Sequence, residues 1–178
     1  MKISSLLSIL ALTIAGSLAR IDSGAAQSFS QPGAGLLADE IIAVAYSGFR
    51  EGQHPDRGDG AVNPTTDQIL EDLEILTSYG FRLIRLYDSG DNSRATIELI
   101  REHNLPLKVL LGIWLDAEVS NHEGCPWLDE PIPEKTLAGN TLRNAAEILR
   151  GIELANRFDD IVIALNVGNE ALVDWNDH

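Results

Sequence analysis

The segment from Ile161 to Val167 constrains the fold of this chain more than any other stretch. It reads Ile-Val-Ile-Ala-Leu-Asn-Val, so Asn166 is the single polar residue among six apolar ones. A half-exposed strand would alternate apolar and polar side chains, whereas a continuous apolar run is typical of a parallel strand that is covered on both faces. We therefore predict a buried parallel strand over residues 161–167, which ends where Gly168 follows.

Three earlier apolar runs precede this strand, and stretches with helical spacing lie between them. We predict strands over residues 40–46, 81–88 and 107–115. The start signals of the first two helices are residues 63–67 and Ser93. The first helix ends near Gly80, the second closes before Asn104, and a third runs from about residue 137 to 157, after a long loop over residues 116–133.

Strands that alternate with helices indicate an α/β fold with a parallel sheet. A self-contained doubly wound sheet and the first half of a (β/α)8 TIM barrel both satisfy this pattern. The turn at residues 46–52, Tyr-Ser-Gly-Phe-Arg-Glu-Gly, lacks the glycine fingerprint of a nucleotide-binding doubly wound sheet. A complete barrel takes about 250 residues. We therefore expect residues 41–178 to form roughly the first four βα units of a TIM barrel, with the chain stopping shortly after the fourth strand.

The N-terminus resembles a secretory signal peptide. Lys2 precedes the apolar stretch 6–18, and small residues follow at Gly24-Ala25-Ala26. This pattern predicts a signal peptide over residues 1–26, cleaved after Ala26, and a flexible Ser/Pro/Gly lead-in over residues 27–40. We expect a secreted or periplasmic protein; the alternative is a membrane anchor formed by an uncleaved signal.

The composition is acidic, with 27 Asp and Glu against 13 Lys and Arg and a formal net charge of −14. No basic cluster is present that could follow a phosphate backbone, so we expect no nucleic-acid partner. Neutral sugars are compatible with this excess of acidic residues. The sequence does not determine the oligomeric state.

His122, Glu123 and Cys125 lie close together in the long loop and raise the question of a metal site. Their spacing matches no common zinc signature, and neither a P-loop nor a nucleophile elbow occurs in the sequence. We therefore expect neither a metal nor a cofactor. Cys125 is the single cysteine and cannot form an internal disulfide.

Glu170 and Asn169 directly follow the last predicted strand. The C-terminal ends of parallel strands are where α/β barrels hold their catalytic groups. A glutamate there can transfer a proton, and the neighbouring amide can donate a hydrogen bond to a ligand hydroxyl. The alternative is that Glu170 stabilises the N-terminus of a following helix.

Arg85 and Tyr87 should share one face of the second strand, because side chains alternate with a period of two. An arginine at such a strand end needs a carboxylate partner, either a catalytic one or one in a structural ion pair. Tyr46, Trp114 and Trp175 are aromatic residues at or after predicted strand ends, where they could contact a sugar ring or fill a core.

These residues together resemble the β-1,3-glucanases of glycoside hydrolase family 17, particularly its bacterial members. The resemblance rests on Val167-Gly168-Asn169-Glu170, on Arg85-Leu86-Tyr87-Asp88 and on Tyr46. It implies that Glu170 is the general acid/base, that Asn169 contacts the sugar at the cleavage site, and that Tyr46 and Tyr87 line the same cleft. The family's nucleophile is a glutamate on the seventh strand, and no residue of this sequence corresponds to it.

The resemblance therefore implies hydrolysis of O-glycosidic bonds in β-1,3-glucan by a retaining mechanism, which requires two carboxyl groups. With the nucleophile missing, we expect this chain to be inactive by itself. A β-glucan transglycosylase would use the same residues with a sugar as acceptor. A non-catalytic glycan-binding or assembly module is the alternative outside the enzymes.

The signal pattern makes a direct prediction about the exported protein. Its N-terminus should lie near Gln27, because cleavage follows small residues such as Ala25 and Ala26. Mass spectrometry of the exported protein would check this, and an intact N-terminus at Met1 or Lys2 would show that the signal is retained.

Overall fold

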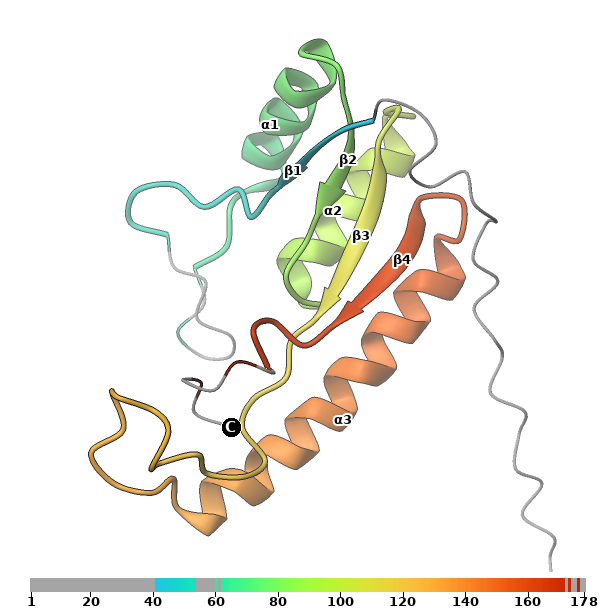
Figure 1. The fold of residues 1–178 in the computed structure, drawn as a ribbon. Helices are drawn as coiled ribbons and strands as arrows, with labels where there is room; N and C mark the ends of the chain where they lie inside the picture. The colour runs from blue at the N-terminus through green and yellow to red at the C-terminus, as the bar shows by residue number, and fades with distance from the viewer. Residues whose placement is uncertain (1–40, 54–59, 61, 172, 174–175, 177–178) are drawn as a thin grey trace, which may run out of the picture. The chain divides into compact units, whose positions relative to one another are not determined.

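The computed structural model describes residues 41–53, 60, 62–171, 173 and 176. The predicted signal peptide (1–26) and lead-in (27–40) lie outside these residues. Within the described part, strands and helices alternate as the sequence predicts (Figure 1). In chain order they are β1 (Ile42–Ala45), α1 (Thr66–Ser78), β2 (Phe81–Arg85), α2 (Asp91–Glu102), β3 (Lys108–Ile113), α3 (Glu134–Arg157) and β4 (Val162–Val167).

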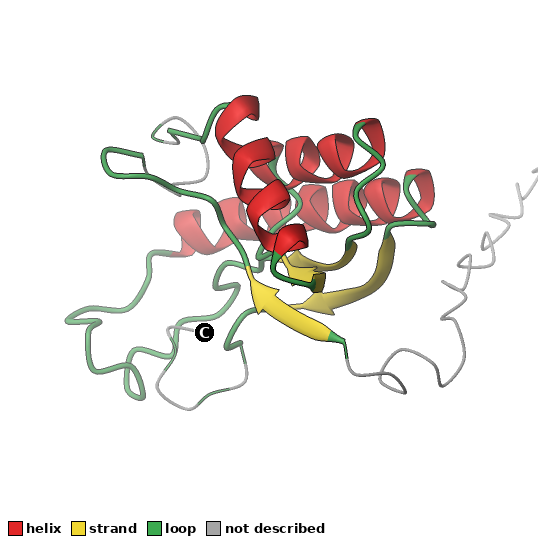
Figure 2. Ribbon diagram, turned by 90° about the horizontal axis from the view of Figure 1, so that it is seen from above, coloured by secondary structure: helices red, strands yellow, loops and turns green. Residues whose placement is uncertain are grey.

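The four strands form one parallel sheet in the order β1-β2-β3-β4, with each strand next to its neighbour in sequence. All three helices of the described part lie on the same face of this sheet (Figure 2). A doubly wound sheet would instead carry helices on both faces and reverse its strand order. The described residues therefore form a singly wound parallel α/β sheet.

The core lies between the sheet and the helices. Ile84, Val109 and Val162 of the sheet and Leu73 and Ile97 of the helices are all fully buried, at 0% exposure. On β4 the alternate side chains Ile163 and Leu165 point to the other face and are only partly buried. No described helix covers that face. The prediction that residues 161–167 are covered on both faces is therefore correct for one face only.

Local side-chain chemistry explains where the helices begin. The side chain of Thr65 accepts from the N–H of Gln68 in a capping box that starts α1, as predicted. Helix α2 begins at Asp91 with Gly90 as N-cap, so the prediction that Ser93 caps it is wrong. The reason is Asp88, whose Oδ1 accepts from the N–H of Gly90 at 2.8 Å and from the Ser93 hydroxyl at 3.1 Å.

Helix α3 begins at Glu134 rather than near residue 137, because Pro133 has a fixed φ that suits a helix start. Its closest approach to the sheet is at Gly151, where an added Cβ would lie 1.9 Å from the Cδ1 atom of Ile113. Glycine at this position therefore lets α3 pack directly on β3. Among the helices that the structure describes, none combines the length and apolar character that a membrane crossing requires.

The two glycines of α3 should respond oppositely to alanine. Gly151→Ala should lower the free energy of unfolding by about 1–3 kcal/mol, because the new methyl group overpacks the contact with Ile113. At Gly139 the nearest atom to an added Cβ is the mobile Nη1 atom of Arg143, at 3.4 Å, so alanine should stabilise the helix by roughly 0.5–1 kcal/mol. Urea unfolding followed by circular dichroism measures the free energy of unfolding of each variant. Equal changes in the two variants would contradict the proposed packing.

Candidate functional site

The chain turns sharply directly after β4. Gly168 and Glu170 have φ angles of 78° and 55°, in the left-handed region that residues other than glycine rarely adopt. The N–H of Gly168 donates to the carbonyl oxygen of Ile113 at 2.9 Å, which holds the turn against the end of β3. Glu170 is exposed at the C-terminal end of the sheet. Because residues 172, 174–175 and 177–178 are not described, the alternative that Glu170 stabilises a following helix stays a prediction.

Three of the predicted site residues come together beside this turn. The guanidinium of Arg85 donates through Nη2 to Oδ1 of Asn169 at 2.7 Å. The same guanidinium lies 4.8 Å from the ring centroid of Tyr87, which confirms that Arg85 and Tyr87 share a face. Because Asn169 accepts through Oδ1, its amide N–H groups are not engaged by Arg85.

Within the described residues, Arg85 pairs with no carboxylate, although the sequence led us to expect one. Its hydrogen-bond acceptor there is the amide of Asn169, a neutral group. Within the part of the chain that the structure describes, its Nε atom is buried and has no hydrogen-bond partner. Buried donors of charged groups are normally hydrogen-bonded, so this N–H marks a position where an acceptor would be stabilised.

Tyr46 lies on the helix side of the sheet, under the loop that leads to α1. It is 9% exposed, and its hydroxyl donates to Oδ2 of Asp72 at 3.1 Å. Arg50 binds the same carboxylate through two hydrogen bonds of 2.7 Å, from Nη1 and Nη2. Gly48 packs on the Tyr46 ring so closely that an added Cβ would lie 2.5 Å from the hydroxyl oxygen. The ring and the hydroxyl of Tyr46 are therefore both engaged within the protein.

The burial of Tyr46 alters its titration. Its pKa is raised well above the ordinary value of 10.0, first because burial disfavours the phenolate and then because Asp72 repels it and accepts its proton in a hydrogen bond. The pKa of Arg50 is raised too, chiefly by its hydrogen bond to Asp72. The three side chains thus form a charge-assisted cluster that ties the β1–α1 loop to α1.

A second buried carboxylate joins the ends of β2 and β3 to α3. Oε1 of Glu147 accepts from the backbone N–H of Ser89 at 2.6 Å and of Trp114 at 3.2 Å. Its other oxygen accepts from Arg150 at 2.6 Å, and the residue is 6% exposed. Glu147 therefore fixes the loops that carry Tyr87 and Trp114.

Arg50, Asp72 and Glu147 were not predicted from the sequence. For Glu147 a signal was present: polar residues recur at helical spacing at positions 140, 144 and 147 of α3, and all three are buried. Arg50 and Asp72 carry no such signal, because their contact depends on how the loop folds back on α1. Trp175, predicted to wall the cleft, lies outside the described residues.

His122, Glu123 and Cys125 lie on the long loop between β3 and α3. A ring nitrogen of His122 lies 3.1 Å from the carbonyl oxygen of Asp129, and Cys125 is buried. Among the described residues, no three His, Cys, Asp or Glu side chains come close enough together to hold a metal ion.

No protein-family model and no curated protein matches this chain. Its structure is similar to part of a solved laminarinase. The match to the crystal structure of an endo-laminarinase from Formosa Hel1_33_131 has a TM-score of 0.56 and 29% sequence identity. It covers 76% of this chain and 32% of the laminarinase chain, so this chain spans about a third of that protein's length. The likeness indicates a fold of the glucan-hydrolase kind, while membership of glycoside hydrolase family 17 stays a prediction.

The Tyr46 cluster predicts a loss of stability at alkaline pH. The folded state keeps the phenolic proton to higher pH than the unfolded chain, so the free energy of unfolding holds below about pH 10 and falls as the pH rises further. Tyr46→Phe should lower the free energy of unfolding by about 1 kcal/mol at neutral pH, because the hydrogen bond to Asp72 is missing. Its further decrease between neutral and alkaline pH should be smaller than that of the unaltered protein. Tyr79→Phe is the control, because Tyr79 is 77% exposed and distant from Asp72. Denaturant unfolding between pH 7 and 11 measures the free energy of unfolding of each variant. If Tyr46→Phe loses as much stability at alkaline pH as the unaltered protein, the loss comes from other groups.

Proposed function

We propose that this chain forms part of a glycoside hydrolase site that cleaves O-glycosidic bonds in β-1,3-glucan. The contact of Arg85 with Asn169 carries the proposal, because it brings a cation and the Tyr87 ring beside the residue that precedes Glu170. A carboxylate at the C-terminal end of a parallel strand is the position that barrel enzymes use for catalysis. The likeness to an endo-laminarinase supports glucan as the substrate class.

The sheet is proposed to be the first half of a (β/α)8 barrel of glycoside hydrolase family 17. Sequential strand order and helices on a single face support this, since a barrel is a singly wound parallel sheet closed on itself (Figures 1 and 2). The partly exposed apolar side chains Ile163 and Leu165 would then point into the barrel interior. Four further strands, from polypeptide outside residues 41–178, would complete the barrel.

In the proposed mechanism Glu170 acts as general acid and then as general base. It protonates the leaving glycosidic oxygen, while a second carboxylate, about 5 Å away, attacks the anomeric carbon from the opposite face. Glu170 then removes a proton from water, which releases the sugar with retained configuration. The second carboxylate would come from outside the described residues.

The neighbouring side chains have separate roles in this proposal. The buried Nε–H of Arg85 is suited to the nucleophilic carboxylate, whose ionised form a guanidinium favours. The amide of Asn169 donates to a sugar hydroxyl, and Tyr87 and Trp175 provide aromatic contacts. Tyr46, whose hydroxyl donates to Asp72, contributes through the order of its loop.

Two alternatives share part of this site. A transglycosylase would use the same residues and pass the glycosyl group to a sugar instead of water, and a glycan-binding module would bind without turnover. We propose that the protein acts outside the cytoplasm, on the basis of the signal pattern at residues 1–26.

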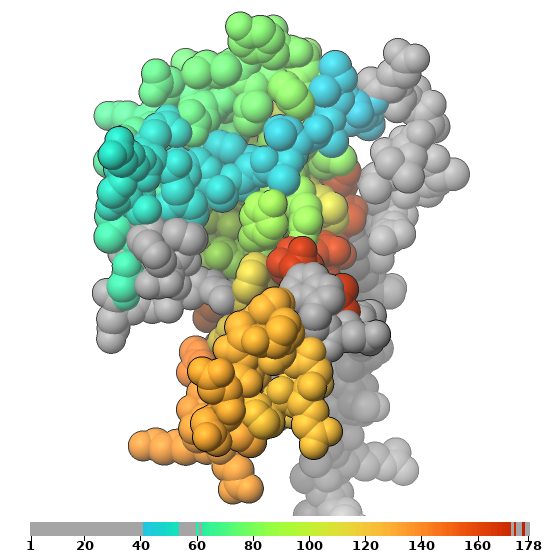
Figure 3. All heavy atoms as spheres, turned by 60° about the vertical axis from the view of Figure 1, so that its left-hand side comes forward, coloured from blue at the N-terminus to red at the C-terminus, as the bar shows by residue number. Residues whose placement is uncertain are grey.

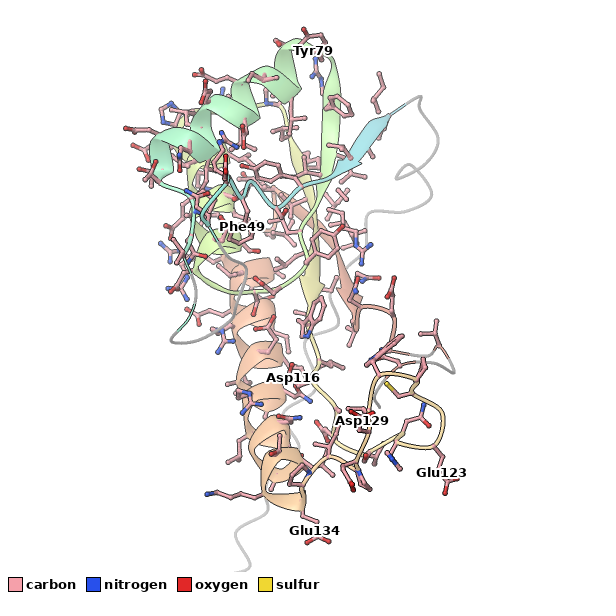
Figure 4. The ribbon with its side chains drawn as sticks, turned by 90° about the vertical axis from the view of Figure 1, so that its left-hand side faces the viewer. Phe49, Tyr79, Asp116, Glu123, Asp129 and Glu134 are labelled. Carbon is pink, nitrogen blue, oxygen red and sulfur yellow. The ribbon has the colours of Figure 1, made fainter. Side chains whose placement is uncertain are left out.

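Glu170→Gln tests the catalytic assignment in the longest natural product of the gene. This change removes the proton donor but keeps its shape, so turnover of laminarin should fall by about 10²–10⁴-fold. Aryl glucosides with a good leaving group should lose less in the first step, because they need little protonation. Glu123→Gln is the matched control, an exposed glutamate on the loop at the same end of the sheet (Figure 4).

Turnover, reaction products and glucan binding distinguish the hydrolase from the transglycosylase and the binding module. Near wild-type laminarin turnover by Glu170→Gln would exclude Glu170 as the acid/base. Longer oligosaccharides formed in the presence of a sugar acceptor would identify a transglycosylase. Glucan binding with no turnover by the unaltered protein would identify a binding module.

A further inference from the structure

Helix α3 extends past the sheet that it covers. It has 24 residues, against 13 in α1 and 12 in α2. In Figure 1 it continues beyond the ends of the strands, and Figure 3 shows its first residues, in orange, at the lower end of the surface. A helix of this length offers more surface than its packing on the sheet uses.

Apolar side chains occupy the exposed side of α3. The residues that α3 buries are Asn140, Asn144, Glu147, Gly151, Leu154 and Ala155. Its exposed large apolar residues are Leu142 at 74% exposure, Leu149 at 68%, Ile152 at 45% and Ile148 at 38%. Each of the other helices and strands in the described part carries at most one such residue. Exposed apolar groups gathered on one element indicate a surface that binds a partner.

The exposed apolar residues repeat with the spacing of a coiled-coil seam. They are Ala138, Leu142, Ala145, Leu149 and Ile152, separated by alternating steps of four and three residues, and all five are exposed. This spacing, about 3.5 residues on average, places side chains on one stripe that can pack against a second helix. We call these five residues the α3 stripe.

Completion of a barrel would leave the centre of the α3 stripe uncovered. Helix α2 lies on one side of α3, where Arg157 is 3.8 Å from Glu98. A following barrel helix would cover the other side, on which Ile148 lies. By helical geometry, Leu142 and Leu149 point away from the sheet, between these two sides. A partner for them therefore comes from outside the barrel.

The α3 stripe is complementary to itself when two copies of the helix run antiparallel. We align Leu142 with Ile152 of a second copy. The same alignment places Ala145 opposite Leu149, so that a small side chain meets a large one, which is how packed layers interdigitate. In a two-fold symmetric contact each of these pairs occurs twice. One register thus matches the large residues of both copies.

The charge distribution favours α3 as a contact between copies. The chain has a formal net charge of −14, so most surfaces of two copies repel each other. Helix α3 is different, because its basic residues Lys135, Arg143, Arg150 and Arg157 outnumber its acidic residues Glu134, Glu147 and Glu153. Antiparallel pairing also brings Lys135, in the first turn, near Asp159 of the second copy, which follows the end of the helix.

We propose that the α3 stripe is a dimerisation surface, on which α3 of a second copy of this chain packs antiparallel. The two-fold axis passes between Ala145 and Leu149 of each copy. The contact does not involve the segments after β2 and β4 that carry Arg85 and Glu170, so it is independent of the proposed chemistry.

Sedimentation velocity over a range of concentrations tests the dimer in the longest natural product of the gene. Leu142→Glu and Leu149→Glu each place a charge in the apolar contact, so each should raise the dissociation constant of the dimer by at least about tenfold. Ile75→Glu is the matched control, because it adds the same charge at an isoleucine of α1 that is 49% exposed. It should leave the dimer unchanged. Urea unfolding checks that each variant is folded.

A charge exchange tests the antiparallel direction. Lys135→Glu places an acid near Asp159 of the second copy, so it should weaken the dimer about threefold or more at low ionic strength. Asp159→Lys in the same chain should restore the affinity, because opposite charges then face each other again. In a parallel pair Lys135 would lie near its own counterpart, and the second change would restore nothing.

Weakening by the α3 variants alone, with restoration in the double variant, supports the antiparallel dimer. A protein that is monomeric at every concentration overturns it. A dimer that neither Leu142→Glu nor Leu149→Glu weakens overturns it as well, since the contact then lies elsewhere, such as at the strand edges. Equal weakening by Ile75→Glu would assign the effect to net charge and likewise overturn it. Absence of restoration in the double variant overturns the antiparallel pairing.

Discussion

The buried carboxylate of Glu147 is the interaction on which the arrangement of the C-terminal sheet edge depends. It accepts the backbone N–H groups that follow β2 and β3 while it is fixed on α3. Inside a protein such hydrogen bonds to a charged group are strong, and removal of the carboxylate would leave buried donors without an acceptor. Its partner Arg150 compensates the charge at 2.6 Å. Helix α3 is therefore more than a cover for the sheet, because it sets where the strand ends and their loops begin.

The parallel arrangement of the strands determines which residues lie at this edge of the sheet. All four strands run in the same direction, so the residues after each strand collect at one end, whatever their separation in sequence. Arg85 and Asn169 meet in this way although 84 residues separate them. The opposite end of the sheet holds short connections such as Tyr79-Gly80. This division, with rigid strands below and longer loops above, is the general design by which α/β enzymes place their chemistry.

Much of the fold was predictable from local patterns, whereas the contacts between side chains were less so. Apolar runs identified the four described strands, and residues 63–67 identified the start of α1, since both signals lie within a few neighbouring residues. Ser93 misled the prediction for α2, because Asp88 engages its hydroxyl from outside the helix. The partner of Arg85 was expected to be a carboxylate and is an amide, since a sequence reveals that a buried charge needs an acceptor but not which acceptor folding brings near. The cluster around Asp72 depends on a loop path that no periodicity encodes, whereas Glu147 belongs to a helically spaced set of buried polar residues on α3 that the sequence does show.

The left-handed backbone at Glu170 has a consequence for how this protein could change under selection. A side chain other than glycine, asparagine or aspartate at such a φ costs about 1 kcal/mol or more. Variants chosen only for resistance to heat would therefore drift toward glycine or asparagine at this position. Under the proposed function, variants chosen for turnover of a glucan would keep the glutamate at the expense of stability. In that proposal, position 170 is a point where the demands of folding and of chemistry oppose each other within one residue.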